Sequence, residues 1–157
     1  MVEDSLLQPF IRAVGNVVGT MAFTKLAVGK PESKLTPVAC GIVSGVCGLL
    51  GKDAAGSFAI TFERDALLHI ASRMMYTQLT ELNSEVVDVV GEIANMVSGG
   101  ARRELDEIGV SIDMSLPVLI TGAGHQIRHR GDGPFTHVPF ECEAGSLFLE
   151  IFLRRAR

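Results

Sequence analysis

The sequence is poor in cysteine and has no cysteine spacing that suggests a disulfide framework. Its three cysteines, Cys40, Cys47 and Cys142, are an odd number, and none belongs to a C-x-x-C pair. No positively charged segment precedes an apolar segment at the N-terminus, as it would in a secretory signal. We therefore expect a cytoplasmic protein with reduced thiols.

A hydrophobic run long enough to cross a membrane is also missing. The longest charge-free candidate, TPVACGIVSGVCGLLG from Thr36 to Gly51, falls short of the ~20 apolar residues that a spanning helix needs. It is also rich in glycine, so we interpret it as a buried strand and expect no membrane partner.

Positive charge is not concentrated anywhere in the chain. The formal net charge is -4 and the pI is about 5.5, with charges of both signs interspersed. Because no basic stripe is present to neutralise phosphates, we expect no nucleic-acid partner. The 157 residues, 47% of them hydrophobic, are enough for a sizeable core, and no linker or low-complexity run divides them. We predict one domain over residues 1–157.

Three segments place apolar residues at helical intervals. They are residues 3–21, 63–75 and 79–109. Asp4 or Ser5 is placed to cap the first helix, and Asn83 or Ser84 to cap the third. The third helix should end near Gly109.

Strands are expected where short runs rich in Val and Ile lie between turn signals. Cys40–Leu50 and Ser57–Phe62 should form a hairpin through GKDAAG, and GKPESKLTP should break the chain before it. In the last third, the predicted strands of an antiparallel sheet are PVLITG, HQIRHR, FTHVPFEC and SLFLEIFLRR. Helices and strands are segregated, without β-α-β alternation. The predicted fold class is therefore α+β, a two-layer sandwich of an antiparallel or mixed sheet and long helices.

The segment DVVGEIANMV, residues 88–97 of the third helix, combines an apolar stripe with a polar face. At about 100° per residue, Asp88, Glu92 and Asn95 fall opposite the stripe and should face water. Glu92 and Asn95 are three residues apart, so their side chains emerge as neighbours about one turn apart. The stripe consists of Leu82, Val86, Val89, Val90, Ile93, Met96 and Val97.

Two glycines surround this amide, because Gly91 and Gly99 lie four residues before and after Asn95. A glycine inside a helix costs about 1 kcal/mol relative to alanine, so the pair needs a reason. One reason is access, since bare flanks would let Asn95 enter a concavity on another molecule. The alternative is a merely solvated polar face, with glycines that let another helix cross closely. The spacing by itself leaves both interpretations open.

Two other patterns are interpreted as structural. His125, His129 and His137, with His69 far away, have no cysteine or paired carboxylate at ligand spacing. We interpret them as polar strand positions and predict no metal site. GVCGLLGKD lacks the glycine spacing and the Ser or Thr of a phosphate-binding loop, so we interpret it as strand and turn.

The spacing Asp88-x3-Glu92-x2-Asn95, followed by Pro117, resembles the signature of the CheC/CheX family of bacterial chemotaxis phosphatases. GEIANMVSGGARREL and DMSLPVLITG resemble the CheX members in particular. PFIRAVGNVVGTMA, SGVCGLLG and GSFAITF also look like segments of this family. The resemblance spans nearly the whole chain and implies a CheC/CheX-like fold.

This resemblance implies hydrolysis of the phosphoryl-aspartate of a CheY-type response regulator. The regulator would bring its own Mg²⁺ and lysine, so no cofactor is expected on this chain. Asn95 would hold a water in line with phosphorus, since its amide both donates and accepts hydrogen bonds. Glu92 would pair with the regulator's lysine, and Asp88, Gly91 and Gly99 would belong to the surface that binds the regulator.

The resemblance also bears on the number of sites. If residues 3–21 are a diverged copy of the active helix, Asn16 aligns with Asn95, but Ala13 takes the Glu position and Pro9 the Asp position. We therefore expect one site per chain and, as in CheX-like members, a homodimer. The alternative function is a non-catalytic module that binds a receiver or serves in a signalling assembly through the same helix face.

Overall fold

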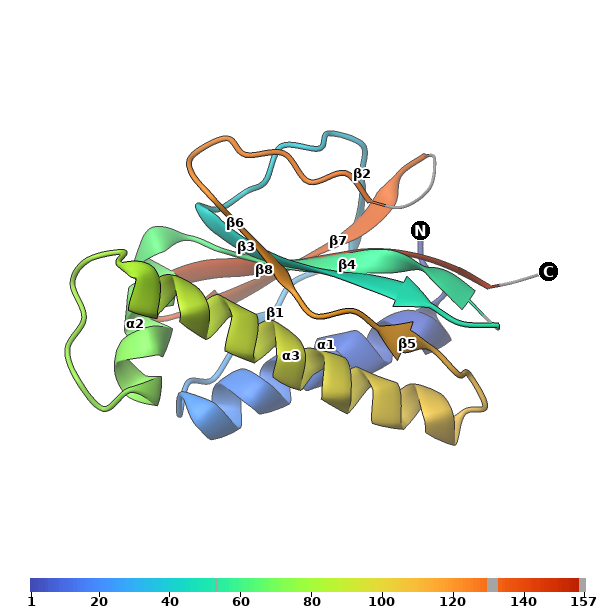
Figure 1. Ribbon diagram of the computed structural model, residues 1–157, viewed down its shortest axis with the longest axis horizontal. Coiled ribbons are helices and arrows are strands. Elements are labelled where there is room, and N and C mark those ends of the chain that lie inside the picture. Colours follow the sequence, from blue (N-terminus) through green and yellow to red (C-terminus); the bar gives the residue numbers. More distant parts are fainter. Residues whose placement is uncertain (53, 130–132, 156–157) are drawn as a thin grey trace.

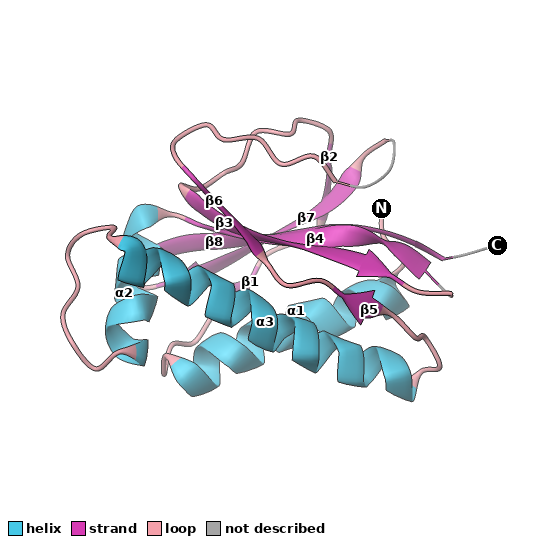
Figure 2. Ribbon diagram, in the orientation of Figure 1, coloured by secondary structure: helices cyan, strands magenta, loops and turns pink. Residues whose placement is uncertain are grey.

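The computed structural model describes residues 1–52, 54–129 and 133–155. In these residues one sheet has α1 and α3 packed side by side under one face and loops over the other (Figure 1, Figure 2). The predicted α+β class is confirmed. The helices are α1 (Asp4–Met21), α2 (Arg64–Met74) and α3 (Ser84–Glu107). The strands are β1 (Ala27–Val28), β2 (Glu32–Lys34), β3 (Val43–Leu50), β4 (Ala54–Phe62), β5 (Asp113–Met114), β6 (Val118–Thr121), β7 (Phe135–Cys142) and β8 (Gly145–Arg155).

The sheet is antiparallel, and its strands follow the order β1-β7-β8-β4-β3-β5. The expected hairpin of β3 and β4 is present, with Val43 opposite Phe62. β2 lies beside β7, and β6 and β5 pair with successive parts of β3. Long strands therefore form the centre of the sheet and short strands form both of its edges.

The main core lies between the sheet and the helices. Phe10 of α1 packs against Phe58 of β4, with ring centroids 5.2 Å apart. α3 approaches β3 closely at Gly45, where an added Cβ atom would lie 3.2 Å from the Val90 side chain and 3.3 Å from that of Ala94. Because the apolar stripe of α3 is held against β3, the opposite side of the helix points to solvent.

The ends of α3 agree with the sequence prediction. The side chain of Asn83 accepts a hydrogen bond from the Val86 amide at 3.0 Å, which caps the first turn. The helix ends at Glu107, and Gly109 then adopts a φ of +82°, which glycine reaches without strain.

The predicted cap of α1 is wrong. Asp4 and Ser5 already lie inside the first turn, and Glu3 occupies the cap position without a side-chain cap bond. The Ser5 hydroxyl donates to the Glu3 carboxylate at 2.9 Å, and the Arg155 guanidinium donates to the same carboxylate at 2.8 Å. This long-range contact with β8 is not visible in the local sequence.

Several strand boundaries also differ from prediction. HQIRHR forms no strand in residues 125–129, where the structure has only an isolated bridge between Val38 and Gln126. β2 lies inside GKPESKLTP, which was expected to break the chain, because residues 32–34 pair with β7. β4 begins at Ala54, earlier than predicted, and Asp53 of the GKDAAG turn lies outside the described residues. At β2 and at the start of β4, pairing with the distant strands β7 and β8 overrides local propensity.

Two further observations concern the whole chain. None of the helices in the described ranges is long and apolar enough to span a membrane. Cys40, Cys47 and Cys142 are all free thiols.

Candidate functional site

The polar face of α3 consists of Asp88, Glu92 and Asn95. All three are exposed, as the helical period predicts. The opposite stripe is buried at Val86, Val89, Val90, Ile93 and Val97 and half-buried at Leu82 and Met96. Among the residues that the structure describes, none of the three polar side chains has a hydrogen-bond or ion-pair partner. Their polar atoms are therefore available to another molecule.

Gly99 provides an open flank beside Asn95. The nearest neighbour of a Cβ atom added at Gly99 would be Nη1 of Arg103, 4.0 Å away at the end of a flexible side chain. Gly100, the next residue, is different, because its added Cβ would lie 3.3 Å from Cβ of Ala13 on α1. The helix-crossing explanation therefore applies to Gly100, and the access explanation fits Gly99.

Gly91, on the other flank, faces a neighbouring strand. A Cβ atom added there would lie 3.6 Å from Cδ2 of Leu119 on β6, an ordinary van der Waals contact. Pro117, the proline of the sequence signature, directly precedes β6. β6 thus runs along the Gly91 side of α3, and Gly91 marks the boundary between the polar face and the sheet edge.

The corresponding region of α1 has no comparable polar face. Ala13 is buried against Gly100, and Pro9 is buried as well. Asn16 is exposed and lines a cavity of about 210 Å³ between α1 and α3. Nearby, an ion pair between Arg12 of α1 and Glu104 of α3, 2.9 Å apart, joins the two helices. Of the two helices, only α3 combines an exposed amide with an exposed carboxylate one turn away, that of Glu92.

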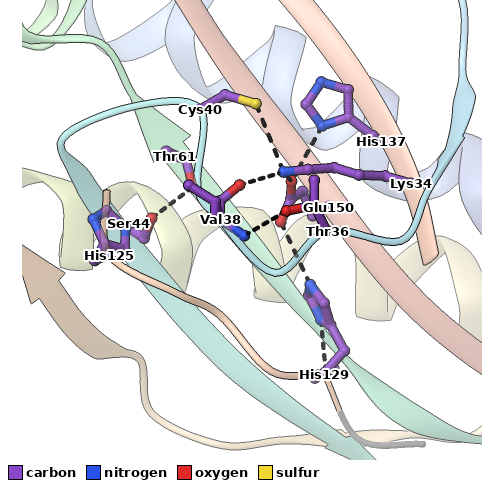
Figure 3. Close-up of polar contacts among 11 residues, drawn as sticks. Lys34, Thr36, Val38, Cys40, Ser44, Thr61, His125, His129, His137 and Glu150 are labelled. Carbon is purple, nitrogen blue, oxygen red and sulfur yellow. Dashed lines mark hydrogen bonds and ion pairs between the residues drawn. The ribbon is translucent and has the colours of Figure 1, made fainter. Parts of the chain in front are cut away.

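A second group of polar side chains lies on the loop-covered face of the sheet (Figure 3). It consists of the buried Glu150 with Lys34, Cys40, His129 and His137 around it, and we call it the buried polar cluster, although Cys40 at its rim is exposed. Sequence analysis missed it because these residues come from distant parts of the chain. The only sequence signal is the set of histidines, whose pattern predicts polar strand positions.

The four histidines do not gather at one point. His129 and His137 both approach the Glu150 carboxylate. His125 instead lies 2.6 Å from the Ser44 hydroxyl, and His69 lies 3.3 Å from a carboxylate oxygen of Glu143. The interpretation of these residues as strand positions holds for His137 on β7 but is wrong for His125 and His129, which lie in a loop.

Comparison with protein families identifies a matching family. The family described as chemotaxis phosphatase CheX matches residues 43–141, which include the whole of α3. A curated relative, the CheY-P phosphatase CheX of Thermotoga maritima, is 29% identical over 105 residues. That match covers 64% of this chain and 59% of the relative, so the chain spans less than two thirds of the relative's length.

Solved structures show the same fold. The chemotaxis protein CheX from Vibrio vulnificus is 42% identical, with a TM-score of 0.88 and coverage of 95% of this chain and 99% of that chain. The CheX-CheY-BeF3-Mg complex from Borrelia burgdorferi contains a chain that is 24% identical, with a TM-score of 0.80 and coverage of 95% and 97%. At this lower identity the likeness concerns the fold.

Proposed function

The chain belongs to the chemotaxis phosphatase CheX family, and from this premise we propose that it hydrolyses the phosphoryl-aspartate of a CheY-type response regulator. The observation that carries the proposal is the polar face of α3, where Glu92 and Asn95 are exposed one turn apart and have no partner among the described residues. The relative from Thermotoga maritima, named a CheY-P phosphatase, supports the proposed reaction.

Asn95 is proposed to act by positioning water. An acyl phosphate is already reactive, and a receiver would supply Mg²⁺ and a lysine to neutralise the phosphoryl oxygens. A side chain that holds water in line with phosphorus then needs no basic group. The Asn95 amide has one acceptor and two donors, and none of them is used by the described part of the chain. The acceleration of hydrolysis would come from the orientation of this water relative to phosphorus.

Glu92 is proposed to dock the receiver. Its carboxylate emerges one turn before Asn95 and would form a charge-assisted contact with the receiver's lysine. Asp88 extends the negative charge by a further turn, and the open flank at Gly99 leaves room for the partner's surface. Gly91 would lie at the rim of this interface.

The test compares the loss of phosphate from a phosphorylated CheY-type receiver with and without the full chain. The wild-type chain should accelerate release, and Asn95→Ala should lose that acceleration. A 100-fold acceleration would correspond to about 2.7 kcal/mol in the barrier. Asn16→Ala is the matched control, because Asn16 is also an exposed asparagine on a helix of the same layer. It should leave the rate unchanged.

The alternative function is decided by the same experiment. A wild-type chain that binds the phosphorylated receiver without accelerating phosphate release would be a non-catalytic binding module. Equal rates for the wild type and Asn95→Ala would remove the proposed role of the amide.

A further inference from the structure

The buried polar cluster lies on the loop-covered face of the sheet (Figure 3), whereas α1 and α3 pack under the opposite face (Figure 1). Glu150 on β8 and His137 on β7 are directly opposite each other in the strand register. Lys34 comes from β2, which pairs with β7, and Cys40 comes from the loop that leads to β3. His129 comes from the loop after β6. The fold thus brings residues from five segments to one point.

A cation already occupies the centre of this cluster. The Lys34 ammonium donates to Oε2 of Glu150 at 2.5 Å, to the Val38 carbonyl at 2.8 Å and to Sγ of Cys40 at 3.6 Å. Nδ1 of His137 lies 3.2 Å from the same Glu150 oxygen. The potential ligand atoms of Cys40, His137 and Glu150 all lie within 4.8 Å of one another. These three groups therefore lie around a single cation position, which the Lys34 ammonium occupies.

A second observation points to the same place. Oε1 of Glu150 and Nε2 of His129 are buried and face each other at 3.6 Å, an ion-pair distance that is too long for a hydrogen bond, and neither atom has a hydrogen bond to any other described residue. The exposed fractions of these two side chains are only 1% and 2%. His129 is oriented by the contact of its Nδ1 with the Ser57 hydroxyl at 2.9 Å. A buried carboxylate oxygen without a hydrogen bond is unfavourable, so the Glu150 carboxylate favours a cation that binds it directly.

The donor set matches zinc. A cysteine thiolate, imidazole nitrogens and a carboxylate oxygen are the ligands that Zn²⁺ takes in tetrahedral sites. The soft thiolate disfavours Mg²⁺ and Ca²⁺, which prefer oxygen ligands. Thiolate and carboxylate together carry two negative charges, which one Zn²⁺ would neutralise. His129 is held by Ser57 and approaches the second oxygen of Glu150, which is the kind of outer contact that orients a carboxylate ligand.

We propose that Cys40, His137 and Glu150 form a Zn²⁺ site in which the metal displaces the Lys34 ammonium, while His129 faces the other oxygen of the Glu150 carboxylate. Binding releases the Cys40 thiol proton to solvent. Lys34 leaves at the same time, because a retained ammonium would repel the ion. The Lys34 side chain is 12% exposed on a short edge strand, and its flexible stem allows the ammonium to swing into water. This site is separate from the proposed phosphatase site.

The test is a Zn²⁺ titration of the chelator-treated full chain by calorimetry. The wild type should bind one equivalent, and Cys40→Ser should lose that binding. Cys40 is exposed, so this change should not disturb folding. Cys142→Ser is the matched control, because Cys142 is also a free thiol but lies outside the cluster, and it should bind as the wild type does. Co²⁺ should give thiolate charge-transfer absorption in the wild type and not in Cys40→Ser.

Lys34→Met tests the displacement. Removing the competing ammonium should tighten Zn²⁺ binding by about tenfold, whereas a purely structural Lys34–Glu150 pair would give the opposite result or none. If Lys34→Met is poorly folded without metal, Zn²⁺ should raise its Tm more than that of the wild type. Absence of stoichiometric binding, or equal binding by Cys40→Ser, would overturn the site. Weaker or unchanged binding by Lys34→Met would overturn the displacement.

Discussion

At the scale of single residues, Glu92 has an exposed carboxylate that forms no hydrogen bond or ion pair within the described residues. We expect Glu92→Ala to weaken binding of the phosphorylated receiver by about tenfold, or ~1.4 kcal/mol, and to change the maximal rate much less. The reason is that a charge pair with a lysine contributes to docking. Raising the salt concentration should move the wild type toward the variant. Binding titrations and saturation kinetics separate the two effects.

The control for this prediction is Glu107→Ala, which removes the same charge from an exposed position at the far end of α3. It should bind the receiver as the wild type does. If Glu92→Ala also behaves as the wild type in affinity and turnover, the proposed charge pair does not exist.

Glu150 provides a prediction about stability and pH. Burial acts to raise its pKa, but contacts with His129, His137 and Lys34 outweigh burial and lower the pKa of Glu150 to about 2, from an ordinary value of 4.5. A carboxyl whose folded pKa is depressed stabilises the fold above its unfolded pKa, and that stability is lost as the pH falls through the folded pKa. The window is therefore about pH 4.5 down to pH 2.

In chelator-treated protein, we expect the wild type to lose about 3 kcal/mol more of its free energy of unfolding across this window than Lys34→Met/Glu150→Gln does. The double variant is the reference because Glu150→Gln alone would leave Lys34 buried without its partner, which is strongly destabilising. Urea unfolding at several pH values measures the difference. Parallel pH profiles for the two proteins would show that Glu150 does not carry this stability.

At the scale of elements, α3 has two adjacent glycines with opposite surroundings. Gly99 faces open space, so Gly99→Leu should leave the free energy of unfolding unchanged or raise it by up to about 1 kcal/mol, since leucine is the better helix former. The new side chain would nevertheless stand about one turn from Asn95 and hold the receiver away. We therefore expect unchanged or higher thermal stability with loss of receiver dephosphorylation.

Gly100→Leu is the contrasting variant, because its side chain would collide with Ala13 and separate α1 from α3. It should lower the Tm, as overpacking in a core typically costs 1–3 kcal/mol. If Gly99→Leu destabilises the protein as Gly100→Leu does, Gly99 serves packing within the chain and the access argument fails.

At the scale of the whole molecule, short strands at the sheet edge suggest an assembly of two copies. Within the last third, β6 lies at the edge on β3, and Leu116 and Val118 are 79% and 63% exposed there. Unpaired edges of this kind invite pairing with another chain, and pairing across a two-fold axis would satisfy both copies. We expect light scattering to give twice the 16.8 kDa chain mass.

The polar face of α3 should remain free in that dimer, so each dimer should bind two receivers. A fully active monomer at micromolar concentration would contradict the expected dimer. A dimer that binds only one receiver would show that the two sites are coupled or that one is covered.

Much of the helical layer followed from the sequence, because its signals are local. The period of α3 placed its buried stripe and its polar face on the correct sides, and Asn83 and Gly109 marked its ends. The hairpin of β3 and β4 followed from two apolar runs and a turn between them. Helical periodicity and turn chemistry act over a few residues, so they can be recognised without the fold.

The structure alone decided what depends on residues far apart in the chain. β2 exists because β7 lies beside it, and Glu3 rather than Asp4 occupies the cap position of α1 while its carboxylate binds Arg155. Gly99 and Gly100 are neighbours in the sequence, yet only the packing of α1 distinguishes an open flank from a helix crossing. The residues of the cluster around Glu150 follow no regular spacing in the sequence. Strand pairing and buried charge contacts join distant segments, so their partners become defined only when the chain folds.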